Sequence, residues 1–182
     1  MKKDKEHTLG REYVIQFAGL GLGIHEFEFE VKDKFFANFE GSAIDNGKFK
    51  IDLELNKQTN MLVLKFFIKG TTHVECDRCS DMFDLKVTGE QQLIVKLGEE
   101  DFGDNDEIIA LPFGESEIDV SRYIYEFIVL SLPLRRLHPD VKGKTTCNKE
   151  VLKKLEEIAL KEEEEKKIDP RWEKLKGIKF DN

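Results

Sequence analysis

Strict alternation of apolar and polar residues is the feature that most limits how this chain can fold. Phe49 to Leu55 reads Phe-Lys-Ile-Asp-Leu-Glu-Leu, and residues 24–31 alternate too, with one step out of phase between Ile24 and Phe27. Successive side chains of a strand point to opposite faces, so this pattern predicts strands with one buried face and one solvated face. The phase step allows a bulge near His25.

Further strands are predicted by short apolar or alternating runs between turn residues. An Asn56–Asn60 turn joins Phe49–Leu55 to an apolar run and predicts a hairpin. The other predicted strands are Tyr13–Phe17, Met61–Ile68 with its continuation Thr71–Glu75 after Gly70, Phe83–Val87 and Gln91–Leu97. About six or seven antiparallel strands are enough to curl into a small barrel or a strongly twisted sheet.

Two helices are predicted in the last third of the chain. Apolar residues at helical spacing predict one over about 120–131, with Asp119 or Ser121 as its cap and Pro133 as its end. Asn148 caps the second, whose apolar positions give way to the charged run 162–167. The predicted fold is therefore α+β: an antiparallel, strongly twisted or barrel-like β-sheet with C-terminal helices.

We expect two parts along the chain. Residues 1–147 form a β-rich domain with one packed helix, at about 120–131. Residues 148–182 comprise the C-terminal helix, a charged linker and a tail that begins Asp169-Pro170-Arg171-Trp172.

The charge balance limits the partners that we expect. The 182-residue chain has a net charge of −8, which disfavours an overall basic nucleic-acid binder, although a local basic patch remains compatible with it. The acidic segments 99–107 and 162–165 could shield a basic partner, although a solvated loop is the preferred interpretation of the first.

The sequence also indicates a compartment. No apolar run approaches the roughly 18 residues that span a bilayer, and no apolar stretch follows the charged start, so we expect neither a membrane segment nor a signal peptide. The cytoplasm is the expected location, where thiols stay reduced.

Cys76-Asp77-Arg78-Cys79 is the strongest local motif. Two cysteines separated by two residues can direct both thiolates at one ion, and His138 and Cys147 downstream would complete a Cys₃His set for structural Zn²⁺. Reduced, packed cysteines are the alternative interpretation. A redox motif is disfavoured, because such a CxxC usually opens a helix and no helical pattern follows Cys79.

Three arginines accompany this motif. If the two halves of the candidate metal site meet, Arg78, Arg135 and Arg136 converge at one corner, where their planar guanidinium groups suit RNA phosphates. Surface ion pairs with the abundant glutamates are the alternative. We find no nucleophile elbow, P-loop or HExxH motif, so the sequence does not predict an enzyme.

Four segments, in order, resemble the YceD family. Val74–Cys79 is similar to its C-x-R-C segment, and residues 126–134 resemble its acidic-apolar helix ending in Leu-Pro. His138 and Cys147 match its following His and Cys at a wider spacing, and residues 169–176 resemble its closing motif, with lysines in part of that pattern. The resemblance covers roughly residue 60 to the end.

The resemblance implies a role in the accumulation of large-subunit (23S) ribosomal RNA. The expected function is a non-enzymatic ribosome-biogenesis factor that binds precursor rRNA or a basic large-subunit ribosomal protein. Two alternatives stay open: an rRNA-processing enzyme with an unrecognised site, and a protein–protein adaptor that docks through its C-terminal tail. The tail residues proposed for docking are Pro170, Arg171, Trp172 and Leu175.

Overall fold

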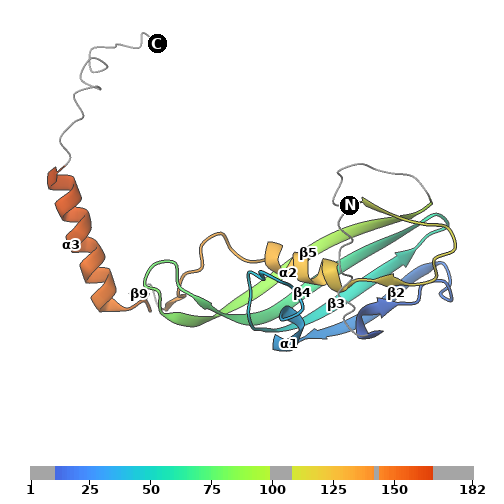
Figure 1. Cartoon of the computed structure of the whole chain (residues 1–182), viewed down its shortest axis with the longest axis horizontal. Helices are drawn as coiled ribbons and strands as arrows, with labels where there is room; N and C mark the ends of the chain where they lie inside the picture. Colours follow the sequence, from blue (N-terminus) through green and yellow to red (C-terminus); the bar gives the residue numbers. More distant parts are fainter. Residues whose placement is uncertain (1–10, 99–107, 142–143, 166–182) are drawn as a thin grey trace, which may run out of the picture.

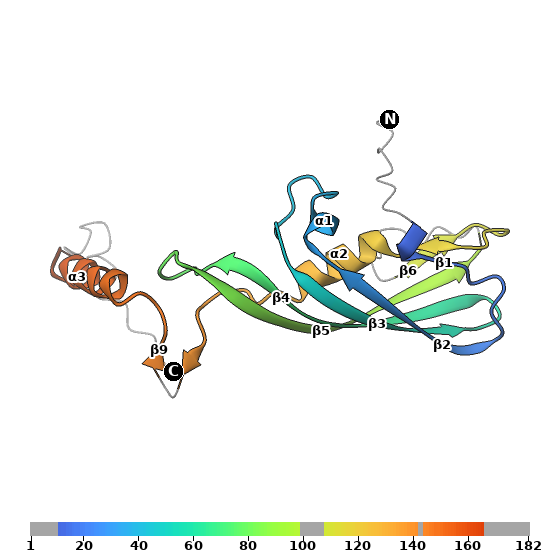
Figure 2. The same cartoon turned by 90° about the horizontal axis from the view of Figure 1, so that it is seen from below.

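An open five-stranded sheet forms the body of the protein (Figures 1 and 2). The computed structural model describes residues 11–98, 108–141 and 144–165. Its strand order is β2-β3-β4-β5-β6, antiparallel throughout except for the parallel pair β5–β6. The elements are η1 (Arg11–Tyr13), β1 (Val14–Ile15), β2 (Gly23–Val31), α1 (Asp33–Phe36), β3 (Lys48–Lys57), β4 (Met61–Glu75), β5 (Met82–Leu97), β6 (Ile108–Leu111), β7 (Ile118–Asp119), α2 (Ser121–Leu130), β8 (Asp140–Val141), β9 (Lys144–Thr145) and α3 (Lys149–Glu165).

The alternating segments form the sheet as the sequence predicts. β3 buries Phe49, Ile51, Leu53 and Leu55, while the residues between them face away from the core. Helices α1 and α2 and strand β1 cover one face of the sheet, and no described element covers the other face along β2–β4 (Figure 2). The two faces of one strand therefore meet very different surroundings.

Helix α2 closes the main core. Its apolar side, with Ile124, Phe127 and Ile128, packs on the sheet, and the Phe127 ring meets the edge of Phe66 with centroids 5.0 Å apart. The Asp119 carboxylate accepts a hydrogen bond from the backbone N–H of Ser121 at 2.8 Å, in the first turn of the helix. The residue that precedes the helix is Val120, which has no capping side chain, so the prediction of Asp119 or Ser121 as the cap is wrong.

The described sheet is open rather than barrel-like, with β2 and β6 at its edges. The bulge that the phase step allows near His25 does not occur, because β2 pairs with β3 residue by residue from Gly23 to Val31. Ile24 faces solvent, with 62% of its surface exposed. It therefore lies on the same face as the glutamates, and the strand alternates without interruption. A short 3₁₀ turn takes the place of the start of the predicted Tyr13–Phe17 strand.

The two strands predicted at Phe83–Val87 and Gln91–Leu97 are one continuous strand, β5. Gly89 lies between them and does not end the strand. A Cβ at this position would collide with the side chain of Ser131, whose Cβ lies only 2.7 Å away. The glycine is therefore a point of close approach between β5 and the end of α2.

Candidate functional site

Strands β4 and β5 extend beyond the rest of the sheet as a two-stranded arm. Pairing between β3 and β4 ends at Lys48 and Thr71, whereas β4 and β5 stay paired as far as Glu75 and Met82. Residues 72–75 and 82–85 therefore pair only with each other. The Cys76–Cys79 turn lies at the tip of this arm, away from the main core (Figure 1).

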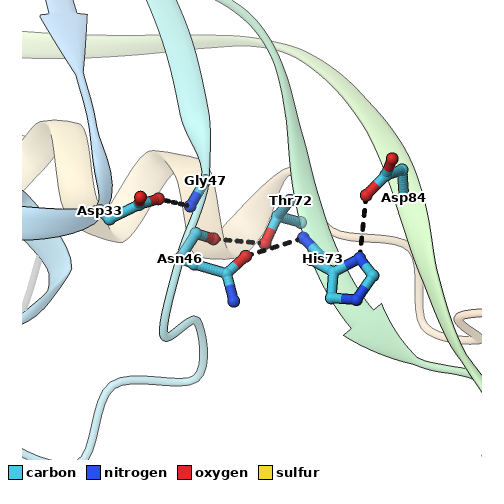
Figure 3. A network of polar contacts seen from close by, with 6 residues as sticks. All are labelled: Asp33, Asn46, Gly47, Thr72, His73 and Asp84. Carbon is cyan, nitrogen blue, oxygen red and sulfur yellow. Dashed lines mark hydrogen bonds and ion pairs between the residues drawn. The ribbon is translucent and has the colours of Figure 1, made fainter.

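A polar network fixes the base of the arm (Figure 3). The Asn46 side chain accepts a hydrogen bond from the backbone N–H of His73 at 3.0 Å, and the buried Thr72 hydroxyl donates to the Asn46 carbonyl at 2.6 Å. Asp33 accepts from the N–H of Gly47, and His73 contacts Asp84 across the strands at 2.9 Å. Asn46 thus continues the ladder where β3 ends.

The tip of the arm is a tight turn that directs two thiols inward. The backbone N–H of Ser80 donates to the Cys76 carbonyl at 2.9 Å, and the N–H of Cys76 donates to the Asp81 carbonyl at 3.0 Å. Ser80 completes the turn in the left-handed region, at φ 59°. The thiols of Cys76 and Cys79 are both buried.

Asp77 holds the segment after α2 against this turn. Its backbone N–H donates to the Arg136 carbonyl at 2.9 Å, and its carboxylate accepts from the Arg136 N–H at 2.6 Å and from the guanidinium at 3.3 Å. This pairing brings His138 over the turn, where its ring lies against Phe83 with centroids 4.5 Å apart.

The start of α3 delivers the last candidate ligand. Asn148 caps the helix by accepting from the Glu150 N–H at 3.0 Å, and its side-chain amide donates to Asp81 in the turn at 3.2 Å. Val151 and Leu152 pack against the cysteine cluster. The cap predicted from the sequence therefore also places the adjacent Cys147 beside the arm.

The four predicted metal ligands converge. One donor atom from each of Cys76, Cys79, His138 and Cys147 lies within 4.8 Å of the other three. The Sγ atoms of Cys76 and Cys147 are 3.8 Å apart, and the Nδ1 of His138 lies 3.5 Å from Cys79 Sγ and 3.7 Å from Cys147 Sγ. The group could hold a metal ion.

These separations fit a tetrahedral ion. With bonds of about 2.3 Å to sulfur and about 2.05 Å to nitrogen, tetrahedral zinc sets two sulfurs about 3.8 Å apart and a sulfur and a nitrogen about 3.6 Å apart. The measured pairs are close to both values. The donor set, three thiols and one imidazole, is one that zinc favours.

The local field favours one thiolate. Burial raises the pKa of the Cys76 thiol, but hydrogen bonds from backbone N–H groups, those of Arg78 and Cys79 first among them, outweigh burial and lower the pKa to about 6. The Thr145 hydroxyl lowers the pKa of Cys147, yet burial and the adjacent sulfurs outweigh it and raise the pKa above its ordinary value. A thiolate is the form that binds a cation.

The three arginines are placed differently from one another. Arg78 and Arg135 are exposed, and within the described residues neither is in an ion pair. Arg136 is half-buried and paired with Asp77, which is the structural role that the ion-pair alternative describes. The segments that carry the three arginines do meet at the arm tip.

Several contributors to this site escaped prediction. Asp77 lies inside the CxxC motif and Asp81 and Phe83 follow it closely, but their partners are some 60 residues away in sequence. An acidic residue in a CxxC turn does not by itself predict which distant segment it will contact, because that contact forms only in the tertiary structure. The tail residues 170–175 and the acidic segment 99–107 lie outside the described residues.

The fold and site define an α+β protein with an open sheet and a Cys₃His group at the tip of a two-stranded arm. A family model described as "Large ribosomal RNA subunit accumulation protein YceD" matches residues 64–179, so the chain belongs to the YceD family. Comparisons with curated proteins and with solved structures found no match. None of the helices in the described ranges is both long and apolar enough to cross a bilayer.

Proposed function

We propose that this protein supports the accumulation of large-subunit ribosomal RNA as a non-enzymatic binding factor in the cytoplasm. The observation that carries the proposal is the YceD family match, which begins within β4 and includes β5, α2 and all four candidate ligands. The matched part therefore contains the whole arm and the elements that complete it. The function is proposed for this unit, with the uncovered sheet as a further surface.

The metal centre in this proposal is structural zinc. The four convergent protein donors would fill a tetrahedron, whereas catalytic zinc sites keep one position open for water or substrate. Zinc here would join the arm tip, the segment after α2 and the start of α3. Its role would be to present these three segments together.

Two classes of partner fit this presentation. The exposed Arg78 and Arg135 beside the zinc turn would contact phosphates of precursor rRNA. The net charge of −8 favours a basic large-subunit ribosomal protein instead. RNA binding should weaken steeply with added salt and on arginine substitution, whereas binding of a basic protein should weaken when acidic residues are neutralised.

Depletion of the protein in its host tests the proposal. Large- and small-subunit RNA and their precursors are then measured on a gradient, and we expect a selective loss of large-subunit RNA. Rescue with the wild-type chain, with Arg78→Gln/Arg135→Gln and with a deletion of 169–182 separates the arginine corner from the tail. Unchanged RNA levels after depletion would contradict the proposed function.

A second assay addresses catalysis. The purified, zinc-loaded protein is incubated with precursor rRNA and Mg²⁺, and we expect the RNA to be neither cleaved nor modified. A product that is lost on substitution of a described residue would establish an enzyme and overturn the binding-only proposal.

A further inference from the structure

The outer edge of β2 offers unpaired backbone groups. In an antiparallel pair, alternate residues direct both backbone groups toward the neighbouring strand and the residues between direct theirs away. The Tyr13 hydroxyl donates to the Glu30 carbonyl at 3.1 Å, which places Glu30 in the set that faces the free edge. Ile24, Glu26 and Glu28 follow at the same period, and within the described ranges β2 has a strand neighbour on one side only.

The side chains of the same residues form an acidic row on the uncovered sheet face. Glu26 lies directly opposite Glu54 on β3, and Glu28 lies directly opposite Asp52. Directly opposed like charges destabilise a sheet. Lys50 offsets the second pair, at 3.1 Å from Glu28 and 3.2 Å from Asp52, but neither Glu26 nor Glu54 has an ion-pair partner in the described part of the chain.

Two hollows flank this strand. One, of about 470 Å³, lies on the uncovered face and is lined by the acidic row and by Phe67, whose side chain is 39% exposed there. The other, of about 750 Å³, lies beside the end of β2, where Tyr13, Phe29 and Phe35 line it. The rings of Tyr13, Phe29 and Phe35 are almost fully buried, and the rest of this second lining is polar or charged. A segment laid along the edge of β2 would therefore have the acidic row on one side and a mostly polar hollow on the other.

We propose that an extended, basic segment of a partner protein adds to the sheet as a strand along the free edge of β2. Its backbone would pair with Ile24, Glu26 and Glu28, and every second side chain, Lys or Arg, would lie over the glutamates. The side chains between would be apolar and would lie beside His25 and Phe27. RNA is disfavoured at this edge, because the acidic row repels phosphates.

This inference rests on the proposed function, since it chooses a basic protein over RNA as the partner at this edge. The probe is a labelled, acetylated peptide of sequence Lys-Val-Lys-Val-Lys-Val-Lys. Its matched control is Lys-Lys-Lys-Lys-Val-Val-Val, with equal charge and composition. Fluorescence anisotropy measures binding, and hydrogen exchange measures protection of the Ile24, Glu26 and Glu28 amides. We expect tighter binding of the alternating peptide and slower exchange at these three amides.

Variants locate the contact. Glu26→Gln/Glu28→Gln should weaken binding of the alternating peptide by about twofold to thirtyfold, as expected for two cross-strand ion pairs. Glu28→Pro removes one edge N–H, which an edge strand tolerates, and should weaken binding by about tenfold. Glu90→Gln is the control, because Glu90 lies on β5 of the same sheet, away from this edge, and binding should change by less than about twofold.

Three results would overturn the inference: equal binding of both peptides, unchanged exchange at the β2 edge, or a peptide that is displaced by single-stranded RNA at this edge. If Glu28→Pro fails to fold, the exchange measurement on the wild-type protein decides. Depletion reports on rRNA accumulation independently, so a negative peptide result leaves the proposed function standing.

Discussion

The main sheet and the arm are held together by different means. The core under α2 consists of large apolar side chains from the sheet, α1 and α2, many of them fully buried. The cluster at the arm tip has five buried residues, three of which are the cysteines of the candidate metal site. The same two strands, β4 and β5, run through both regions.

If the proposed zinc is bound, this difference predicts that the arm depends on it more than the main sheet does. Burying a large apolar side chain contributes about 1.5–3 kcal/mol, whereas ordering one residue costs about 1.5 kcal/mol of conformational entropy. The main core has enough large side chains to offset this cost. The tip has only two buried residues that are not cysteines, Val74 and Phe83. Their burial does not offset the entropy cost of ordering the turn, the 134–138 segment and the start of α3. Structural metals stabilise small clusters of this kind.

Metal removal should give the largest difference in stability between the arm and the main sheet. Binding of structural zinc is worth on the order of 10 kcal/mol, more than a cluster of this size can replace. Treating the zinc-loaded protein with a chelator should therefore abolish hydrogen-exchange protection at 72–75, 82–85 and 149–159, while β3 stays protected. Cys147→Ser should reproduce this pattern, and the chelator should then add nothing. An arm whose amides stay protected from exchange without metal would show that the tip is stable without a metal ion.

A cavity in the main core should act on the whole protein. Phe66 is fully buried against Phe127, so Phe66→Ala should lower the free energy of unfolding by about 3–5 kcal/mol in urea titrations. Phe67→Ala is the matched control on the opposite sheet face, where a cost below about 1 kcal/mol is expected. Zinc should still bind to folded Phe66→Ala. Loss of zinc binding under native conditions would contradict the separation of the two regions.

Crowding at Gly89 tests the junction between α2 and the sheet. Gly89→Ala should cost about 1–3 kcal/mol, because the new methyl group collides with Ser131. Adding Ser131→Gly should recover most of this loss, as thermal melting can measure. If the regions are independent, zinc affinity stays at the wild-type value in both variants. A parallel fall in zinc affinity would mean that α2 transmits its displacement to His138.

Breaking the Asp77 contact should have the smallest effect and one confined to the arm. Asp77→Asn weakens the hydrogen bonds that order the segment carrying His138, a loss of about 1.4 kcal/mol, or about tenfold in zinc affinity. Competition with a chromophoric chelator measures this affinity. Arg135→Gln, which alters an exposed neighbour, is the control and should leave it unchanged. The sheet should melt at the same temperature in both variants.

The individual strands could be predicted from the sequence more readily than the order and direction in which they pair. Period-two alternation identifies β2 and β3 because one face is buried and the other is not, and the Asn148 cap identifies the start of α3. The sequence divides β5 into two strands on either side of residues 88–90. Gly89 lies in that gap, and the need for a glycine there comes from Ser131, which is distant in sequence. Strand order and the parallel β5–β6 pair depend on contacts between segments, which local patterns do not encode.

The candidate metal site was predictable from chemistry rather than from spacing. Cysteine and histidine side chains are few in this chain, so the ligands of a Cys₃His set could be named although the halves are far apart. The means of bringing them together could not be named. The Asp77 contacts to Arg136 and the Asn148 contact to Asp81 join ordinary polar residues that nothing in the sequence distinguishes from their many neighbours.

The separation of the ligands along the chain has a consequence for the order of folding during synthesis. The hairpins β2–β3, β3–β4 and β4–β5 join consecutive strands, so they can form as soon as they emerge. Cys76 and Cys147 are 71 residues apart, and the Cys79–His138 contact spans 59. Until residue 147 has been translated, the exposed CxxC turn holds an incomplete ligand set. Capture of a metal by all four candidate ligands would therefore follow the synthesis of residue 147.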